Sequence, residues 1–313
     1  MNWSAEASSG QTVVVTGGSS GIGLAMARYF ASKGQHLYIL DLSTETGEAV
    51  AKQLSSEFPG ATVSFRKSDV SSWDELSRAF KDIYASRGRI DVVMANAGIS
   101  EHGSSSLLAQ EEDEPSQPSL KTLDVNLTGV VYTVKLAVHY MSKNQPSPAN
   151  DSRGAIICTA SNAGIYPFPV APLYAASKGG VISLVRSLGP ALERTQIQIN
   201  ALAPAVLGMS CQIRSDRGRS APACIHVRED GKQRANEGKP ETNIAPSRDL
   251  FTNMVVTPMS TLVRGVDQLL GDRSTTGAVA EIHGGSVTLR PHLEYVDADS
   301  KANLDNFWRL GYA

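Results

Sequence analysis

Residues 12–33 read TVVVTGGSSGIGLAMARYFASK: a β-branched run, a glycine cluster, and a stretch with helical apolar spacing that stops at Gly34. This order predicts a strand, a tight loop and a helix. A glycine-rich loop in that setting is typical of a phosphate-binding turn, because backbone amides and the positive end of the helix favour an anion. Taken alone, the loop also fits an ordinary turn between a strand and a helix.

The glycines of this loop have separate predicted roles. Gly17 would let the chain turn sharply, Gly21 would let the backbone approach a pyrophosphate, and Gly23 would let the helix pack closely on the sheet. Asp41 ends the next predicted strand, where a carboxylate can bind adenosine ribose hydroxyls and repel a 2′-phosphate. No Lys or Arg occupies the loop or position 42, so NAD is favoured and NADP is the second choice. The alternative is that Asp41 caps the following helix.

Strand-like and helix-like segments alternate along the rest of the chain. Further predicted strands cover residues 36–40, 63–65, 91–95, 155–159 and 197–202. Further predicted helices cover residues 44–57, 73–86, 120–142 and 174–193. This alternation predicts an α/β protein with a Rossmann-type doubly wound parallel sheet and helices on both faces. We expect a single domain over residues 1–290 and a C-terminal tail over residues 291–313, with ligands bound at the carboxyl ends of the strands.

Composition and charge fit a globular protein that binds small molecules. The 313 residues carry a net charge of −2, which gives no basic field for a nucleic acid. Three cysteines form no CxxC pair and six histidines show no HExxH spacing, so we expect neither a disulfide nor a metal site. The N-terminus lacks a basic, apolar leader, and no stretch approaches about 18 apolar residues, so we expect no membrane span and a cytoplasmic location.

Tyr174 and Lys178 lie one helical turn apart, which places both side chains on the same face of a predicted helix. A phenol has a reference pKa of about 10, so acid or base work near neutral pH needs a lower value. An ammonium roughly 4.5 Å from the phenolate, at an effective dielectric near 20, contributes about 4 kcal/mol, or close to three pKa units. We therefore expect Lys178 to lower the pKa of Tyr174.

Five features together resemble the short-chain dehydrogenase/reductase family in order and spacing: the glycine loop TGGSSGIG, Asn96-Ala97-Gly98, Asn126, Ser161 and Tyr174-x-x-x-Lys178. The glycine pattern TGxxxGxG is similar to the short, single-domain branch, and the similarity covers roughly residues 10–207 and 241–290. The resemblance implies a nicotinamide-dependent alcohol dehydrogenase or carbonyl reductase that needs no metal. It also implies a homo-oligomer, either a dimer or a tetramer, and a small-molecule substrate. Residues 254–270 and 276–282 are similar to the last helix and the last sheet strand of the family.

The resemblance implies a role for each matching side chain. Tyr174 would exchange the hydroxyl proton, Lys178 would tune it and hold the cofactor ribose, and Ser161 would orient the substrate oxygen. Asn126 would place a water in a relay to Lys178 through a distortion of its helix, and Thr159 competes with Ser161 for its role. The resemblance also implies a set of residues that contact the cofactor, in which Asp69 and Val70 lie at the adenine ring. The set is Gly17, Ser19, Ser20, Ile22, Asp41, Asp69, Val70, Asn96, Ala97, Gly98, Tyr174, Lys178, Val206 and Thr242.

The reaction so implied is hydride transfer between nicotinamide and a secondary alcohol or ketone. The segment that precedes Tyr174 predicts a largely apolar substrate site, lined by Ile165, Pro167, Phe168, Pro169 and Pro172.

Residues 208–240 interrupt the family pattern, because Pro204-Ala205-Val206-Leu207 begins a motif that Glu241-Thr242 completes only 33 residues later. One hypothesis is a translated intron: Gly208-Met209-Ser210 can be encoded G|GTATGTCN, Pro240-Glu241 can be encoded CCAG|AG, and 33 codons keep the frame. The other is a long substrate lid, since loops of this length are often functional. If the segment misplaces Thr242, the chain would bind NAD(H) without turnover, which is the alternative to an enzyme.

The tail after residue 291 carries several large apolar side chains. We expect a helix packed on its own domain, with a cover over the substrate cleft or a subunit interface as alternatives. Together with residues 257–261 (TPMST), the tail is similar to 15-hydroxyprostaglandin-dehydrogenase-like members of the family and to fungal secondary-metabolism dehydrogenases. That similarity implies a role in secondary metabolism.

Overall fold

The computed structural model describes residues 10–101, 107, 114–207 and 256–309 of the chain. These residues contain an eight-stranded sheet in the order β3-β2-β1-β4-β5-β6-β7-β8. Seven strands run parallel and β8 runs antiparallel to β7. The strands are β1 (Thr12–Thr16), β2 (His36–Asp41), β3 (Thr62–Lys67), β4 (Val92–Ala95), β5 (Gly154–Thr159), β6 (Ile197–Pro204), β7 (Val279–His283) and β8 (Ser286–Arg290). The predicted doubly wound parallel sheet is confirmed.

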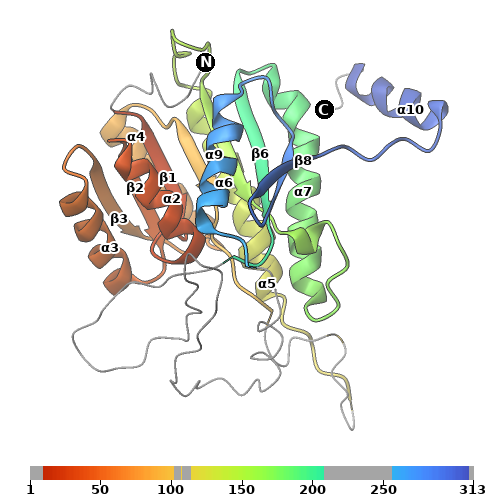
Figure 1. Cartoon of the computed structure of the whole chain (residues 1–313), viewed down its shortest axis with the longest axis horizontal. Helices are drawn as coiled ribbons and strands as arrows, with labels where there is room; N and C mark the ends of the chain where they lie inside the picture. Colours follow the sequence, from red (N-terminus) through yellow and green to blue (C-terminus); the bar gives the residue numbers. More distant parts are fainter. Residues whose placement is uncertain (1–9, 102–106, 108–113, 208–255, 310–313) are drawn as a thin grey trace.

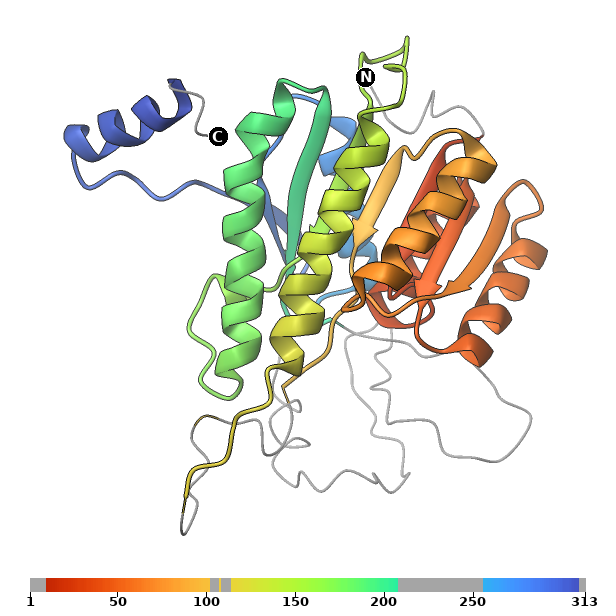
Figure 2. The same ribbon diagram turned by 180° about the vertical axis from the view of Figure 1, so that it is seen from behind.

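Helices cover both faces of this sheet. One face carries α2 (Gly21–Ser32), α3 (Thr44–Glu57) and α9 (Met259–Gly271), which stand in front of the strands in Figure 1. The opposite face, seen in Figure 2, carries α4 (Trp73–Arg87), α6 (Gly129–Met141) and α7 (Pro172–Glu193). Two apolar clusters fill the spaces between these helices and the sheet. Burial of the strands on both faces explains why they read as continuous apolar runs.

Local signals in the sequence set the helix boundaries. α3 begins after Ser43 and α4 after Ser72, and each serine side chain accepts a hydrogen bond from an amide of the first turn. α4 ends at Gly88, whose φ of 70° lies in the left-handed region that glycine enters at little cost. The predicted helices 44–57 and 73–86 therefore match the observed bounds to within one residue.

The last strand, β8, is absent from our sequence prediction. It forms a hairpin with β7 in which His283 pairs with Ser286 across Gly284 and Gly285. Gly284 has a φ of 48°, which suits a two-residue hairpin turn. The Gly-Gly pair between two β-branched runs was the signal for this hairpin.

The tail forms a helix, but it does not pack on its own domain as we expected. α10 (Ala298–Arg309) stands clear of the sheet and its helices in Figures 1 and 2. On the extended arm before it, Leu293 is 86% exposed and Val296 is 95% exposed. An apolar stripe on a helix shows that the helix can pack, but it does not show which surface, if any, receives it.

The chain leaves and re-enters the described fold at neighbouring points. Leu207 forms a parallel bridge with Thr257, and the Thr257 amide donates a 2.8 Å hydrogen bond to the Val206 carbonyl. Residues 208–255 lie outside the described part, so the intron-or-lid hypothesis for residues 208–240 and the predicted role of Thr242 stay predictions. The helix expected over residues 254–270 begins only at Met259, because Thr257 lies in the bridge and Pro258 is the N-cap of α9.

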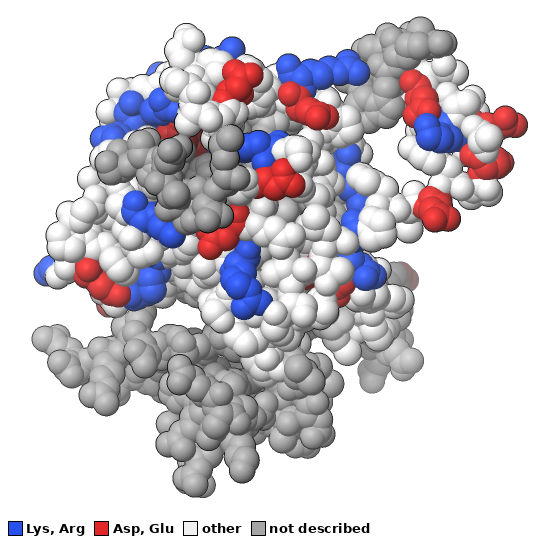
Figure 3. Space-filling view, turned by 45° about the horizontal axis from the view of Figure 1, so that its top comes forward, with Lys and Arg blue, Asp and Glu red and all other residues white. Residues whose placement is uncertain are grey.

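The surface carries no extended field of one sign on the face shown in Figure 3, where Lys and Arg alternate with Asp and Glu. Within the described ranges, no helix is long and apolar enough to span a membrane. The same residues contain no group of three or more His, Cys, Asp or Glu side chains able to hold a metal ion.

Candidate active site

The glycine loop between β1 and α2 is shaped by close backbone contacts. Gly17 has a φ of +64° and Gly21 a φ of +50°, which are conformations that L side chains rarely adopt. A Cβ on Gly17 would lie 2.8 Å from Ala97 Cα, and a Cβ on Gly23 would lie 2.0 Å from the Gly17 carbonyl oxygen. The predicted sharp turn and close helix packing are therefore present.

The N-terminus of α2 suits an anion. Among the described residues, its N-cap Ser20 makes no side-chain capping bond, and its first turn holds no acidic residue. Backbone amides and the helix dipole there favour a phosphate group. Ser20 is exposed at this end, whereas Ser19 is buried and Ile22 half-buried against the apolar cluster under α2. The loop fits the pyrophosphate of a dinucleotide.

Asp41 lies at the end of β2, beside the glycine loop. Its Oδ2 accepts a 3.1 Å hydrogen bond from the Ser19 amide, which ties the strand end to the loop. The N-cap of α3 is Ser43, so the alternative in which Asp41 caps that helix is wrong. Asp41 is half-buried, and its Oδ1 accepts a 3.4 Å hydrogen bond from the Ser43 amide. Its position fits the predicted contact with adenosine.

Asp69 and Val70, the two residues predicted at the adenine ring, are held by contacts within the protein. The Asp69 carboxylate accepts hydrogen bonds from both the amide and the hydroxyl of Ser71, at 2.8 and 2.6 Å. Val70 is 7% exposed, and a Cβ on Gly129 would lie 2.8 Å from its Cγ2. These contacts fix the turn after β3, and the role of both residues at a cofactor stays a prediction.

Asn96 joins the ends of three neighbouring strands. Its Nδ2 donates a 3.1 Å hydrogen bond to the Thr16 carbonyl, and its Oδ1 accepts a 3.0 Å bond from the Thr159 hydroxyl. The Thr16 hydroxyl accepts the amides of Asn96 and Ala97, at 2.9 and 3.1 Å. The Thr159 hydroxyl is therefore engaged by Asn96, and the choice of Ser161 over Thr159 at a substrate oxygen stays a prediction.

Ser161 and Tyr174 meet beyond the end of β5. Ser161 begins the short 3₁₀ helix η3 (Asn162–Gly164), and its Oγ accepts a 3.2 Å hydrogen bond from the Ala163 amide. The Ser161 hydroxyl donates a 3.3 Å hydrogen bond to Asn162 Oδ1, and it lies close enough to the Tyr174 phenol to act on its pKa. A donor and a titratable phenol thus converge from two different elements, which is the arrangement the resemblance implies.

Lys178 follows on the next turn of α7 and is almost fully buried. Its Nζ lies 5.7 Å from the centroid of the Tyr174 ring and donates a 2.7 Å hydrogen bond to the Thr159 carbonyl. A Cβ on Gly98 would lie 3.4 Å from the same Nζ. The turn after β4 therefore passes directly over the ammonium.

Asn126 sits in a distorted helix, as expected. Residues Asp124–Thr128 form a π-helix, η2, between α5 (Lys121–Leu123) and α6. The Asn126 side chain is fully buried; its Oδ1 accepts from the Ile99 amide at 2.7 Å and its Nδ2 donates to the Ile99 carbonyl at 2.9 Å. Asn126 Nδ2 also donates a 3.2 Å hydrogen bond to the Ser177 hydroxyl, and the predicted place of Asn126 in a water relay to Lys178 stays a prediction.

The pKa of Tyr174 is raised in the structure, whereas we expected Lys178 to lower it. Burial raises the pKa of Tyr174, and the hydrogen bond with Ser161 offsets this only in part. Burial also lowers the pKa of Lys178 to about 8. The expected lowering assumed an intermediate dielectric around the pair, whereas both groups are largely buried, so desolvation is the main influence on both pKa values.

Gly164 is a site residue that the motif analysis missed. A Cβ at this position would lie 2.6 Å from the Lys178 carbonyl carbon and 2.7 Å from the Gly179 amide nitrogen. Only glycine lets η3, which begins at Ser161, lie against the backbone of α7 at Lys178. The Asn162-Ala163-Gly164 sequence indicated a turn. It could not show that the turn lies against the backbone of Lys178 and Gly179, which is distant in the sequence.

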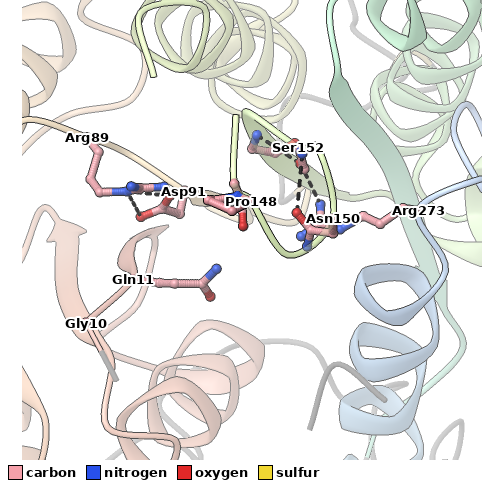
Figure 4. A pocket seen from close by; sticks show the side chains of 10 residues that line it. Gly10, Gln11, Arg89, Asp91, Pro148, Asn150, Ser152 and Arg273 are labelled. Atoms are coloured by element: carbon pink, nitrogen blue, oxygen red, sulfur yellow. Dashed lines mark hydrogen bonds and ion pairs between the residues drawn. The ribbon is translucent and has the colours of Figure 1, made fainter. Parts of the chain in front are cut away.

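A separate hollow lies at the opposite edge of the sheet, among the amino ends of the strands (Figure 4). Arg89 forms a bidentate pair with Asp91, and Asp91 Oδ2 accepts the Thr12 amide at 2.8 Å. Arg273 reaches the hydroxyl of Ser152 at 3.1 Å. These polar groups join the strand starts to the adjoining loops, and they lie away from Tyr174 and the glycine loop.

Fold and site together define a class of protein: a doubly wound sheet of Rossmann type with a Ser-Tyr-Lys cluster at its carboxyl edge. The family model for short chain dehydrogenases matches residues 11–218. The chain belongs to the short-chain dehydrogenase/reductase family.

Relatives come from fungi and from animals. Short-chain dehydrogenase/reductase prx4 of Penicillium roqueforti is 39% identical over 63% of this chain and 54% of its own length. Short-chain dehydrogenase/reductase ATR7 of Stachybotrys chlorohalonatus is 38% identical over 63% and 58%. The human 3-hydroxyacyl-CoA dehydrogenase type-2 is 32% identical over 64% and 74%. The chain thus spans little more than half the length of these fungal relatives.

Two solved structures share the fold. Levodione reductase is 32% identical, with a TM-score of 0.54 over 63% of this chain and 72% of that protein. The protein gox2181 is 23% identical, with a TM-score of 0.65 over 88% and 95%, and supports the fold alone.

Proposed function

We propose that this protein transfers hydride between NAD(H) and a secondary alcohol or ketone of an apolar small molecule. The observation that carries the proposal is the convergence of Ser161, Tyr174 and Lys178 beside the Asn96 turn, at the sheet edge where the glycine loop fits a pyrophosphate. In alcohol oxidation, Tyr174 takes the hydroxyl proton while Ser161 orients the oxygen; in reduction, the proton moves back.

The nicotinamide cofactor, when bound, supplies or accepts the hydride. The residues that would hold it are the α2 amides behind the glycine loop, Asp41 at the ribose, and Lys178 near the reacting end. We propose NAD over NADP because the Asp41 carboxylate would face a 2′-phosphate, and the adjacent Leu42 is an exposed apolar residue.

Apolar side chains near Tyr174 support an apolar substrate. The Phe168 ring lies 6.3 Å from the Tyr174 ring, centroid to centroid, at an interplanar angle of 57°. Phe168 is 39% exposed and its neighbour Val170 is 68% exposed, so both can meet a ligand. Apolar walls with few polar groups are typical of small-molecule sites.

Binding and turnover test this proposal separately. NADH binding is measured by fluorescence, and hydride transfer is measured at 340 nm with cyclohexanol, 1-tetralol, their ketones, levodione and a 3-hydroxyacyl-CoA. We expect Tyr174→Phe to lower kcat at least about 100-fold while NADH binding is kept, because only the proton acceptor is lost. Binding with no turnover of any probe by the wild type, or full activity of Tyr174→Phe, would contradict the proposal.

Cofactor choice has its own test. Asp41→Ser combined with Leu42→Arg removes the repelling carboxylate and adds a cation for a 2′-phosphate. We expect the ratio of kcat/KM for NAD to that for NADP to fall by at least tenfold, with Leu42→Ala as the control that leaves it unchanged. A wild type that prefers NADP would contradict the NAD assignment.

We also propose a cytoplasmic homo-oligomer, a dimer or tetramer, that acts in secondary metabolism. Members of the family are typically oligomeric, and the fungal relatives support a role in secondary metabolism. Light scattering of the purified chain measures its oligomeric state. A monomer at micromolar concentration would contradict the oligomer.

A further inference from the structure

The first turn of α7 is capped from a distant part of the chain. Its N-cap, Ala171, has no side-chain acceptor, and Pro172 has no amide hydrogen. The next two amides, of Leu173 and Tyr174, both donate to Oε2 of Glu101, at 2.8 and 3.3 Å. Glu101 therefore performs the task that a serine or aspartate at position 171 would perform locally.

Glu101 belongs to the segment that passes over the catalytic groups. This segment leaves β4 through the Asn96 turn and is then fixed by Asn126, whose side chain pairs with both backbone groups of Ile99. Two residues later the Glu101 carboxylate reaches the turn that carries Tyr174. The loop after the central strand is thereby joined at one end to the π-helix and at the other to the catalytic helix.

Charge favours the same contact. The positive end of a helix dipole stabilises a carboxylate, and the first turn of α7 contains no acidic residue of its own. A hydrogen bond in which the acceptor is ionised is stronger than one between neutral groups. Replacement of Glu101 by a side chain without an acceptor leaves two amides of a catalytic turn unsatisfied among the described contacts.

Lys178 is held in a different way. One turn further along α7, it is fixed by the Thr159 carbonyl and by the packing of Gly164 against its backbone. Loss of the Glu101 cap should therefore loosen Tyr174 while Lys178 keeps its place. The two functions of the helix, proton exchange and ribose contact, become separable by mutation.

We propose that Glu101 is a positioning residue, whose carboxylate fixes the first turn of α7 and with it the phenol of Tyr174. The inference rests on the proposed function, in which Tyr174 exchanges the substrate proton. It assigns to Glu101 no contact with substrate or cofactor.

Three variants test it against the wild type: Glu101→Ala, Glu101→Gln, and Glu101→Ala combined with Ala171→Ser. We expect Glu101→Ala to lower kcat about five- to tenfold with NADH affinity unchanged. Glu101→Gln keeps an acceptor and should stay within about twofold of the wild-type kcat. The Ala171→Ser hydroxyl can accept one of these two amides and should restore part of the loss, while Ala171→Ser alone is the matched control.

Hydrogen exchange gives a readout independent of activity. The amides of Leu173 and Tyr174 should exchange faster in Glu101→Ala and return toward wild-type rates in the double variant. Unchanged exchange, or a loss of kcat that tracks a loss of NADH binding and is not rescued by Ala171→Ser, would overturn the proposal. If the wild type turns over none of the probes, the proposed function fails, whereas exchange at these two amides still decides whether Glu101 holds the turn.

Discussion

Nζ of Lys178 donates a 2.7 Å hydrogen bond to the carbonyl oxygen of Thr159, the last residue of β5. The ammonium is enclosed, with Lys178 only 3% exposed, and it takes part in no ion pair within the described part of the chain. A carbonyl dipole compensates a buried charge only partly, so burial lowers the pKa of Lys178 to about 8. The site therefore keeps a cation at the expense of stability.

Lys178→Met should stabilise the protein at pH 7 by about 2 kcal/mol and abolish turnover. A fall in pKa from 10.5 to about 8 corresponds to roughly 3 kcal/mol of desolvation, and the lost hydrogen bond offsets about 1 kcal/mol of the gain. Urea unfolding measures the difference. A variant no more stable than the wild type at pH 7 would contradict this reasoning.

The sign of the pH dependence follows from linkage. Because the folded-state pKa of Lys178 lies below the unfolded value, the folded state binds fewer protons between about pH 8 and pH 10.5. Wild-type stability therefore gains from this group as the pH rises through that window. The advantage of Lys178→Met should be greatest below pH 8 and shrink toward pH 10.5, which unfolding curves at several pH values can follow.

Alcohol oxidation should depend on a group with an apparent pKa near 8. Burial raises the pKa of Tyr174 and lowers that of Lys178, so the pair holds both protons below about pH 8 and loses one above it. Only after that loss can the pair accept the substrate proton. We expect kcat to rise about tenfold per pH unit below the midpoint and to level above it.

The matched control for this profile is Lys178→Arg, because arginine stays protonated throughout the range. The step near pH 8 should disappear or move to higher pH in this variant. A wild-type kcat independent of pH between 6 and 9 would count against the coupled pair.

Thr159→Val and Ser161→Ala should separate a structural hydroxyl from a catalytic one. The Thr159 hydroxyl donates to Asn96 Oδ1 at 3.0 Å, so its removal should cost about 1 to 2 kcal/mol of stability and change kcat less than about threefold. Removal of the Ser161 hydroxyl should lower kcat about 100-fold, since it deletes the group that stabilises the substrate oxygen. A large loss of kcat in Thr159→Val with little change in Ser161→Ala would show that Thr159 carries the catalytic hydroxyl and Ser161 the structural one.

Gly164→Ala should be harmful and Gly179→Ala tolerated, although the two glycines face each other. A Cβ on Gly164 meets the Lys178 carbonyl carbon at 2.6 Å, whereas a Cβ on Gly179 finds its nearest neighbour at 3.7 Å. We expect Gly164→Ala to lose about 1 to 3 kcal/mol and to lower kcat, because η3 must move away from α7. Gly179→Ala should gain up to about 1 kcal/mol from helix propensity. Thermal unfolding and kcat of both variants check this.

Deletion of residues 208–240 should leave the framework folded. The flanking residues Leu207 and Thr257 already pair, and residues 241–255 remain to close the gap, so the loop-closure cost changes little. Thermal unfolding and NADH binding of the deletion variant measure this. A variant that fails to fold would show that the segment is part of the core architecture.

Sequencing of the transcript decides the origin of the segment. A main product that lacks these 33 codons supports the translated intron, and the deletion variant should then be the more active form. Uninterrupted reads through codons 208–240 as the main product would end the intron hypothesis and leave the substrate lid.

Much of the fold was readable because its signals are local. The apolar run before Gly17 predicts β1, the helical pattern over residues 44–57 and 73–86 predicts α3 and α4, and the alternation of elements predicts the parallel sheet. The hairpin at Gly284 had such a signal, and we missed it. The tail was misjudged because the sequence shows its apolar residues but not whether any surface receives them.

The sequence by itself determined which residues form the site. Tyr174 and Lys178 share a helix face because of their spacing, and Gly17 and Gly21 are glycines at the two loop positions that have a positive φ. Only the tertiary structure decided how those groups behave. The pKa values of Tyr174 and Lys178, the direction of the Thr159 hydroxyl and the capping of α7 by Glu101 depend on segments far apart in the chain. Desolvation and long-range hydrogen bonds arise from packing, and no local pattern encodes them.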